Sequence, residues 1–238
     1  MVPVASTSTG LQRIGDRAAF EAAFGPALGV SRETADRLTI YTELLAKWQK
    51  AINLVSPASL ADVWHRHMAD SAQLVDLAPS GPLKWVDLGS GAGFPGLVVA
   101  ILLAGRAGSS VTLVESDTRK CAFLGEVVRK TGISGVLAVE ILNARIENPS
   151  TQARLEGAGV GRADVVSARA LAPLERLLTL AGALFAPQTV GLFPKGRDVA
   201  TEIEAAKHLW RFRHELKASR TDADARIVVV RDLEAKTR

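Results

Sequence analysis

The chain has 238 residues, 47% of them hydrophobic, which is enough to bury a full core and excludes a largely disordered chain. Its single cysteine excludes an internal disulfide and a multi-cysteine zinc site, and it favours a reducing, cytoplasmic location. The net charge of +4 is uneven, because residues 1–80 carry 7 basic and 8 acidic side chains whereas residues 81–238 carry 22 and 17. This excess is compatible with a polyanionic partner and also with an ordinary solvated surface.

The first 80 residues are predicted to form a helical extension. Residues 1–10 have no charged start followed by an apolar core, so we expect a mobile segment and no signal peptide. Apolar residues at steps of three and four predict a helix over residues 31–52 with Ser31 as its N-cap. A second helix is expected to begin near Ser59, and the Pro79-Ser80-Gly81-Pro82 segment then ends the extension. No apolar run approaches the ~20 residues that span a membrane.

From residue 83 the hydrophobic pattern alternates between strands and helices, which is typical of an α/β fold with a mainly parallel sheet. Strands are expected at 83–88, 111–115, 136–141, 164–167 and 189–193, and helices at 95–104, 117–131, 174–184 and 197–206. Two further strands, at 211–218 and 226–232, predict a closing antiparallel hairpin. By analogy of fold alone, such a hairpin is typical of S-adenosylmethionine (SAM) dependent methyltransferases and not of dinucleotide-binding domains.

The segment from Asp87 to Gly96 reads as a strand end, a glycine loop and a helix start, where a backbone can approach a nucleotide-like ligand. Two cofactors fit the pattern. Gly89-x-Gly91-x-Gly93 is the loop of SAM enzymes, whereas Gly91-x-Gly93-x-x-Gly96 satisfies the dinucleotide fingerprint. The carboxylate of Asp87 would repel a pyrophosphate but would suit the amino group and sulfonium of SAM, so it favours SAM.

Other candidate residues follow the later strands. Glu115 ends the second strand, where an acidic side chain can accept hydrogen bonds from ribose hydroxyls of either cofactor. The Asn143–Glu147 segment could border an adenine ring or be a plain loop. Arg169, after the fourth strand, could bind a phosphate or the carboxylate of the cofactor, or lie on the surface.

Basic residues near the same sheet edge are candidates for contacts with nucleic acid. Lys195 and Arg197 follow the fifth strand, where they could bind backbone phosphates or be surface charges at a helix start. Arg66 and His67 lie on the second N-terminal helix. His67 falls on its apolar face, so a hydrogen-bonded structural histidine is the default interpretation, and neighbouring histidines on a helix make a poor metal pair.

Taken together, these motifs resemble the small-subunit ribosomal RNA guanine-N7 methyltransferases, the RsmG family, also called glucose-inhibited division protein B. The matching pieces run in family order from about residue 35 to 200: Asn53-Leu54, Arg66-His67, Asp70-Ser71, the loop from Asp87 to Gly96, Glu115-Ser116, Arg145-Ile146-Glu147, Ser167-Ala168-Arg169-Ala170 and Pro194-Lys195-Gly196. The resemblance implies a class I SAM-dependent methyltransferase domain over residues 81–238, preceded by the helical extension over 1–80. It implies methyl transfer from SAM to N7 of guanine 527 in the 530 loop of 16S rRNA.

The resemblance also implies site residues and partners. The cofactor contacts would be Gly89, Phe94, Glu115, Ile146, Glu147 and Arg169, beside Asp87 and Gly91 from the loop itself. Candidates for contact with the substrate RNA are Arg66, His67, Lys195 and Arg197, and positioning candidates are Arg169 and Lys195. The expected partner is 16S rRNA, the small ribosomal subunit or its assembly intermediate, with no membrane, no metal and a monomeric enzyme.

No acid or base residue is expected to be catalytic, because guanine N7 offers a lone pair and needs no deprotonation. An NAD-dependent oxidoreductase is the alternative; Asp87, the closing hairpin and the lack of a substrate domain disfavour it. A non-catalytic RNA-binding module is a third interpretation, which the glycines and carboxylates argue against.

Overall fold

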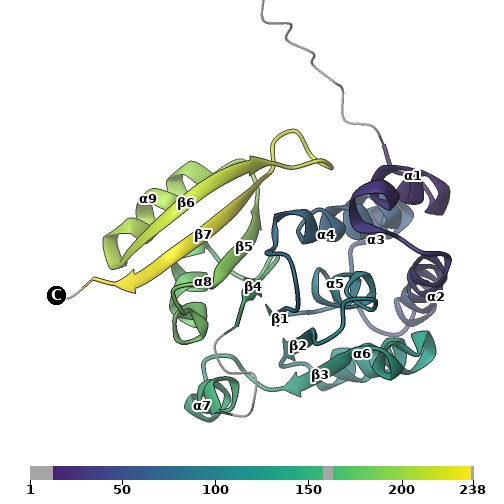
Figure 1. Cartoon of the computed structure of the whole chain (residues 1–238), viewed down its shortest axis with the longest axis horizontal. Helices are drawn as coiled ribbons and strands as arrows, with labels where there is room; N and C mark the ends of the chain where they lie inside the picture. Colours follow the sequence, from purple (N-terminus) through teal and green to yellow (C-terminus); the bar gives the residue numbers. More distant parts are fainter. Residues whose placement is uncertain (1–12, 158–162, 237–238) are drawn as a thin grey trace, which may run out of the picture.

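Seven strands form one mixed sheet at the centre of the molecule (Figure 1). The computed structural model describes residues 13–157 and 163–236; the expected mobile segment at 1–10 lies outside the described residues. The strands are β1 (Lys84–Leu88), β2 (Ser110–Glu115), β3 (Ala138–Asn143), β4 (Val165–Ser167), β5 (Val190–Lys195), β6 (Trp210–Ala218) and β7 (Arg226–Ala235). Their order across the sheet is β3-β2-β1-β4-β5-β7-β6.

The first five strands are parallel, and the last two close the sheet as an antiparallel hairpin. The chain therefore has the predicted α/β fold with the predicted C-terminal hairpin. The order reverses between β1 and β4, and in such sheets ligands bind beyond the carboxyl ends of the strands at that reversal. In the register, Asp87 of β1 lies beside Leu113 of β2 and Ser167 of β4, which fixes what surrounds it.

Helices cover both faces of the sheet. The N-terminal part contains α1 (Arg17–Leu28), α2 (Arg32–Trp48), α3 (Pro57–Ala61), a π-helix (Trp64–Ala69), α4 (Asp70–Ala72) and a 3₁₀ turn (Val75–Leu77). The later helices are α5 (Gly96–Leu102), α6 (Thr118–Thr131), α7 (Pro149–Gly157), α8 (Leu174–Ala181) and α9 (Val199–Leu209), with 3₁₀ turns at Ile133–Gly135 and Gly182–Leu184. Within residues 13–157 and 163–236, no helix has the length and apolar character of a membrane span.

The N-terminal helices differ in detail from the sequence prediction. The helix over α2 is confirmed, with the Ser31 side chain accepting from the N–H of Thr34. The second helix begins at Pro57 and not at Ser59, because Ser56 is the N-cap. It then breaks into a π-helix and short turns, and such departures from the α-helix are frequent at functional sites. α1, capped by Asp16, was not predicted.

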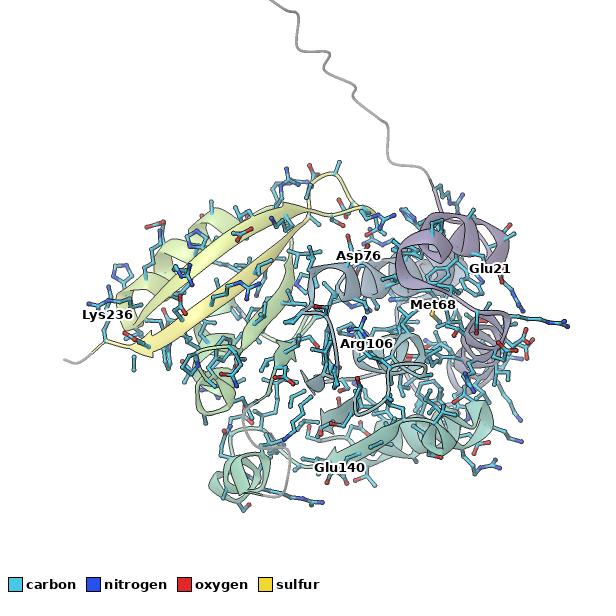
Figure 2. The ribbon with its side chains drawn as sticks, viewed as in Figure 1. Glu21, Met68, Asp76, Arg106, Glu140 and Lys236 are labelled. Carbon is cyan, nitrogen blue, oxygen red and sulfur yellow. The ribbon has the colours of Figure 1, made fainter. Side chains whose placement is uncertain are left out.

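Two hydrophobic cores lie on opposite faces of the sheet. On one face α1, α2, α5 and α6 pack over Trp85 and Leu113, and Met68 lies among the N-terminal helices (Figure 2). On the other face α7, α8 and α9 pack over Val86 and Val166. The predicted boundary at residue 80 thus separates helices from sheet in the sequence, while the helices before it share a core with α5 and α6.

Candidate active site

The loop between β1 and α5 is built on glycines in left-handed conformations. Gly89 has φ +67°, and a Cβ there would lie 2.6 Å from Cδ1 of Leu171. Gly91 has φ +58°, and its N–H donates to Oε2 of Glu115 at 2.8 Å. A side chain would clash at the first position and strain the backbone at both. The loop therefore lies against the end of β2 and the segment that follows β4.

Glu115 holds two loops by their backbones. Its Oε2 accepts from Gly91, and its Oε1 accepts from the N–H of Asp117 at 2.8 Å. Asp117 in turn caps α6 by accepting from the N–H groups of Arg119 and Lys120. The predicted ribose carboxylate is thus also the residue that fixes the glycine loop against the start of α6.

Asp87 does not face a ligand, contrary to the sequence-based expectation. It is fully buried, with Oδ1 accepting from Ser167 Oγ at 2.7 Å and Oδ2 accepting from the N–H of Gly96 at 3.2 Å. Ser167 Oγ also accepts from Nε1 of Trp85 at 2.8 Å. The carboxylate points into the sheet because the neighbouring strand and the start of α5 supply its donors, and it ties β1, β4 and α5 together.

Burial raises the pKa of Asp87 from 3.8 to about 6, against the hydrogen bonds from Ser167 and Gly96, which lower it. A pKa higher in the folded state means that this group stabilises the fold below pH 3.8 and that the contribution is lost as pH rises through 6. We expect the difference in unfolding free energy between wild type and Asp87→Asn to fall by about 2 kcal/mol from pH 4 to pH 7. Urea unfolding at several pH values measures it, and a difference independent of pH would contradict this role.

A cavity of about 430 Å³, here the first cavity, opens beside the glycine loop. Its size suits a nucleoside-sized ligand. Seven of the eight residues predicted to bind the cofactor line it, and Asp87 is the exception: Gly89, Gly91, Phe94, Glu115, Ile146, Glu147 and Arg169. The lining residues come from segments that are far apart in the chain and meet at one edge of the sheet.

The adenine-bordering segment was predicted from the chain after the third strand. Ile146 is 6% exposed and presents an apolar side chain to the first cavity. Glu147 lies at the cavity with an exposed side chain that pairs with Arg176 at 3.2 Å. Hydrogen bonding, chiefly from its own backbone, lowers the pKa of Glu147. The sequence analysis did not identify Lys120, which also lines the first cavity. Its position in the first turn of α6, directly after β2, is the signal that could have identified it.

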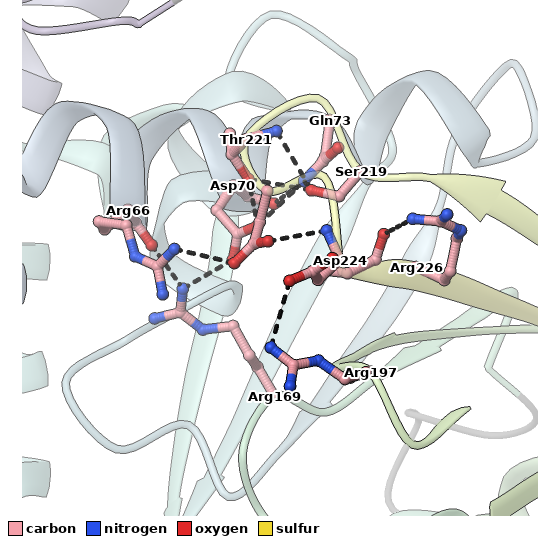
Figure 3. A network of polar contacts seen from close by, with 11 residues as sticks. Arg66, Asp70, Gln73, Arg169, Arg197, Ser219, Thr221, Asp224 and Arg226 are labelled. Carbon is pink, nitrogen blue, oxygen red and sulfur yellow. Dashed lines mark hydrogen bonds and ion pairs between the residues drawn. The ribbon is translucent and has the colours of Figure 1, made fainter. Parts of the chain in front are cut away.

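Arg169 lies between the first cavity and a second one, and it lines both. Its Nη1 donates to Oδ2 of Asp70 at 2.9 Å and to the carbonyl of Arg66 at 3.0 Å. Its Nη2 lies 2.8 Å from Nδ1 of His67, and its guanidinium sits 5.2 Å from the ring centre of Phe94. Figure 3 shows Arg169 against Asp70 and Arg66 of the N-terminal segment. Arg169 is therefore a largely buried residue at the junction of the two cavities and not a surface arginine.

His67 is a buried structural residue and not a surface contact for RNA. It is 7% exposed and stacks on Phe94 with 4.5 Å between ring centres, and Phe94 stacks in turn on Tyr41. Desolvation, with the nearby Arg169 charge, lowers the pKa of His67 to about 3, so the ring is neutral near pH 7. Because Arg169 donates to Nδ1, the proton of the neutral ring lies on Nε2.

The second cavity, of about 590 Å³, is lined by residues from the segment after β4, the end of β5 and the loop between β6 and β7. Lys195 lies inside it with only 8% of its side chain exposed, paired with Glu202 at 2.7 Å. This candidate for contact with backbone phosphates therefore lies within an ion pair inside the cavity and is not an exposed surface charge. The side chain of Arg197 is 82% exposed beside Asp224, which is compatible with the predicted contact with backbone phosphates. Arg66 lines the cavity and pairs with Asp222 at 3.1 Å.

A family model described as rRNA small subunit methyltransferase G matches residues 34–227 of this chain. The chain belongs to that family. The ribosomal RNA small subunit methyltransferase G of Parvibaculum lavamentivorans is 50% identical over 210 residues, which cover 88% of each chain. That of Rhodospirillum centenum is 51% identical over 199 residues, covering 84% of each.

Solved structures resemble this member of the methyltransferase G family in fold, at low sequence identity. A SAM-dependent methyltransferase from Aquifex aeolicus has a TM-score of 0.51 at 14% identity, covering 78% of this chain and 96% of that one. A mutant of MtNAS in complex with S-adenosylmethionine has a TM-score of 0.51 at 17% identity, covering 91% and 83%. The fold is therefore the class I methyltransferase fold, and these names give no support to the NAD-dependent alternative.

Proposed function

We propose that this chain transfers a methyl group from SAM to N7 of guanine 527 in the 530 loop of 16S rRNA. Membership of the rRNA small subunit methyltransferase G family supports the reaction class. The observation that carries the proposal is a pair of cavities that share Arg169, Ala170 and Leu171, one beside the glycine loop and one beyond it. Two ligands could thus approach each other at Arg169, as transfer of a group requires.

The residues of the first cavity fit SAM. Each oxygen of Glu115 accepts one backbone N–H and keeps a second lone pair for a ribose hydroxyl. Ile146 offers an apolar surface to an adenine ring. Arg169 keeps N–H groups beyond the three contacts already described, and these suit the carboxylate of the ligand. SAM supplies an electrophilic methyl group on its sulfonium.

Proton transfer is not required, since N7 attacks through a lone pair. The three groups with strongly displaced pKa values, Asp87, His67 and Tyr41, line neither cavity. The chain's contribution is therefore to position the base and the methyl group in line and to exclude water, and such positioning alone supplies a large part of a rate enhancement.

The substrate is proposed to be 16S rRNA within the small subunit or its assembly intermediate, and the enzyme to act as a cytoplasmic monomer. Exposed arginines at the second cavity support an RNA partner: Arg66 lines it, and Arg197 follows Lys195 at its edge. Both pair with exposed aspartates, and exposed pairs of this kind are weak enough to exchange for phosphates.

We expect 16S rRNA from cells that lack this protein to carry no 7-methylguanosine in the 530 loop. The measurement is mass spectrometry of nuclease fragments, with cells that regain the wild-type gene as the control. The purified protein should then restore the mark on subunits from the deficient cells when SAM is added. Unchanged 7-methylguanosine in the deficient cells would sink the proposal.

A further inference from the structure

The second cavity contains side chains whose chemistry the methyl-transfer step does not use. It is bounded by the segment Arg169–Pro173, by Pro194, Lys195 and Gly196 at the end of β5, and by the loop between β6 and β7. Figure 3 shows how that loop is held, with Thr221 and Ser219 against Asp70 and Gln73 of the N-terminal segment. The second cavity is thus a recess whose walls are held by hydrogen bonds, and it adjoins the first cavity.

Three carboxylates line this recess, and two of them are fully occupied. Asp70 accepts from Gln73 and Thr221 through Oδ1 and from Arg169 through Oδ2. Asp222 accepts from the N–H of Asp224 through Oδ1 and from Arg66 through Oδ2. Both carboxylates therefore have structural partners on each oxygen.

Glu202 is different, because only one of its oxygens is used. Oε2 accepts from the N–H of Leu174 at 2.7 Å and forms an ion pair with Nζ of Lys195 at 2.7 Å. Among the residues that the structure describes, no hydrogen bond reaches Oε1. Lys195 donates one of its three N–H groups to the carbonyl of Ala172 at 2.7 Å, so its ammonium keeps donor capacity. The pair thus presents an acceptor beside a donor to the cavity.

We propose that Glu202 and Lys195 read the target base, with Oε1 of Glu202 accepting from N1–H and the 2-amino group of guanine and Nζ of Lys195 donating to O6. This inference rests on the proposed methylation of a guanine. Guanine presents acceptor, donor, donor along that edge, whereas adenine presents a donor beside an acceptor. The same pair therefore accepts guanine and rejects adenine, because a mismatched base would leave buried groups unpaired.

The arrangement suits the reaction. N7 lies on the side of the purine away from the 2-amino group, so a base held by this edge at Glu202 can turn N7 towards the first cavity. The Lys195–Glu202 pair is neutral as a unit, so it does not oppose the positive charge that methylated guanine gains. A base from a single-stranded RNA loop can enter such a recess because it is not held in a duplex.

Inosine tests the proposal, since it keeps N7, O6 and N1–H and lacks only the 2-amino group. Small subunits are reconstituted with ligated 16S rRNA that carries guanosine or inosine at the target position, and methyl transfer from labelled SAM is measured. For the wild-type chain we expect kcat/KM to be about tenfold to a hundredfold lower for inosine, the range for one hydrogen bond to a charged group. In Glu202→Gln we expect the two substrates to differ by less than about threefold, at a lower rate for guanosine.

Glu202→Gln is chosen because its oxygen can stay with Leu174 and Lys195, which turns the new amide NH₂ towards the base. Asp222→Asn is the matched control, a carboxylate of the same cavity that should keep the wild-type preference. SAM affinity by calorimetry should be unchanged in Glu202→Gln, because Glu202 does not line the first cavity.

Equal rates of the wild-type chain on guanosine and inosine would overturn the inference while leaving the proposed function intact. A wild-type preference that persists in Glu202→Gln would assign Glu202 a purely structural role and would also overturn it. No transfer to the guanosine subunits at all would instead refute the proposed function, and the inference with it.

Discussion

Arg169→Ala is expected to lower methyl transfer by at least about 100-fold, because Arg169 borders both cavities and a misplacement of about 1 Å can cost that much. The unfolding free energy should fall by about 3 kcal/mol. The Arg169 and Asp70 side chains are only 17% and 18% exposed, so the substitution leaves a poorly solvated carboxylate without its cation. Single-turnover methylation and urea unfolding measure the two effects.

Arg211→Ala is the control for this experiment. Its side chain is 77% exposed at the start of β6, and its ion pair with Glu234 is long at 3.8 Å, so the expected change in stability is below about 0.5 kcal/mol. Arg169→Lys should recover part of the stability and little of the transfer, since an ammonium is a point charge without the planar fork that reaches Asp70, Arg66 and His67 together. Wild-type transfer rates in Arg169→Ala would show that the residue positions neither ligand.

Gly96→Ala is expected to destabilise the fold by about 2–3 kcal/mol, although alanine is the better helix former. A Cβ at Gly96 would meet the Leu113 side chain and would lie 2.7 Å from Oδ2 and 2.9 Å from Cβ of Asp87. All of these groups are fully buried and cannot move aside. α5 would have to shift away from β1, which would also weaken the hydrogen bond between Gly96 and Asp87 and loosen the glycine loop.

Gly125→Ala, the same substitution at another position, is expected to change the unfolding free energy in the opposite direction. Gly125 lies within α6, where nothing stands within 4 Å of an added Cβ, so we expect a gain of about 0.5–1 kcal/mol. Urea unfolding of both variants, with calorimetric titration of SAM, is the measurement. Equal effects at the two positions would contradict the close contact of α5 with β1. The third glycine of the apparent dinucleotide fingerprint is thus explained by packing of helix on strand.

Local patterns in the sequence predicted much of this architecture. The alternation of strands and helices from residue 83, the glycine loop after β1 and the position of Glu115 at the end of β2 depend on neighbours a few residues away, and the structure has them as expected. The burial of Asp87 away from the first cavity could not be predicted, because its donor Ser167 stands 80 residues along the chain. The ion pair of Lys195 could not be predicted, because its partner Glu202 comes from α9, whose packing does not follow from the sequence pattern.

The π-helix from Trp64 to Ala69 is a second feature that the sequence could not predict. It is stabilised by tertiary contacts, among them the bond from Arg169 to the carbonyl of Arg66, and no local signal predicts a π-turn in place of an α-turn. α1 could have been found from Asp16 as an N-cap and Gly29 as a C-cap, although Pro26 inside it argues against a helix. α7 follows a segment read as a plain loop.

The contact of the N-terminal helices with the glycine loop has a consequence for modularity. The hydroxyl of Tyr41 in α2 donates to the carbonyl of Ala92, and the Tyr41 and His67 rings flank Phe94. The glycine loop therefore takes its shape partly from residues that precede the sheet in the chain. A methyltransferase core cut at residue 81 would keep every glycine of the motif and lose the wall against which the loop rests. In this chain the N-terminal helices and the sheet therefore form one structural unit, and a sheet transplanted without these helices would not keep the shape of its glycine loop.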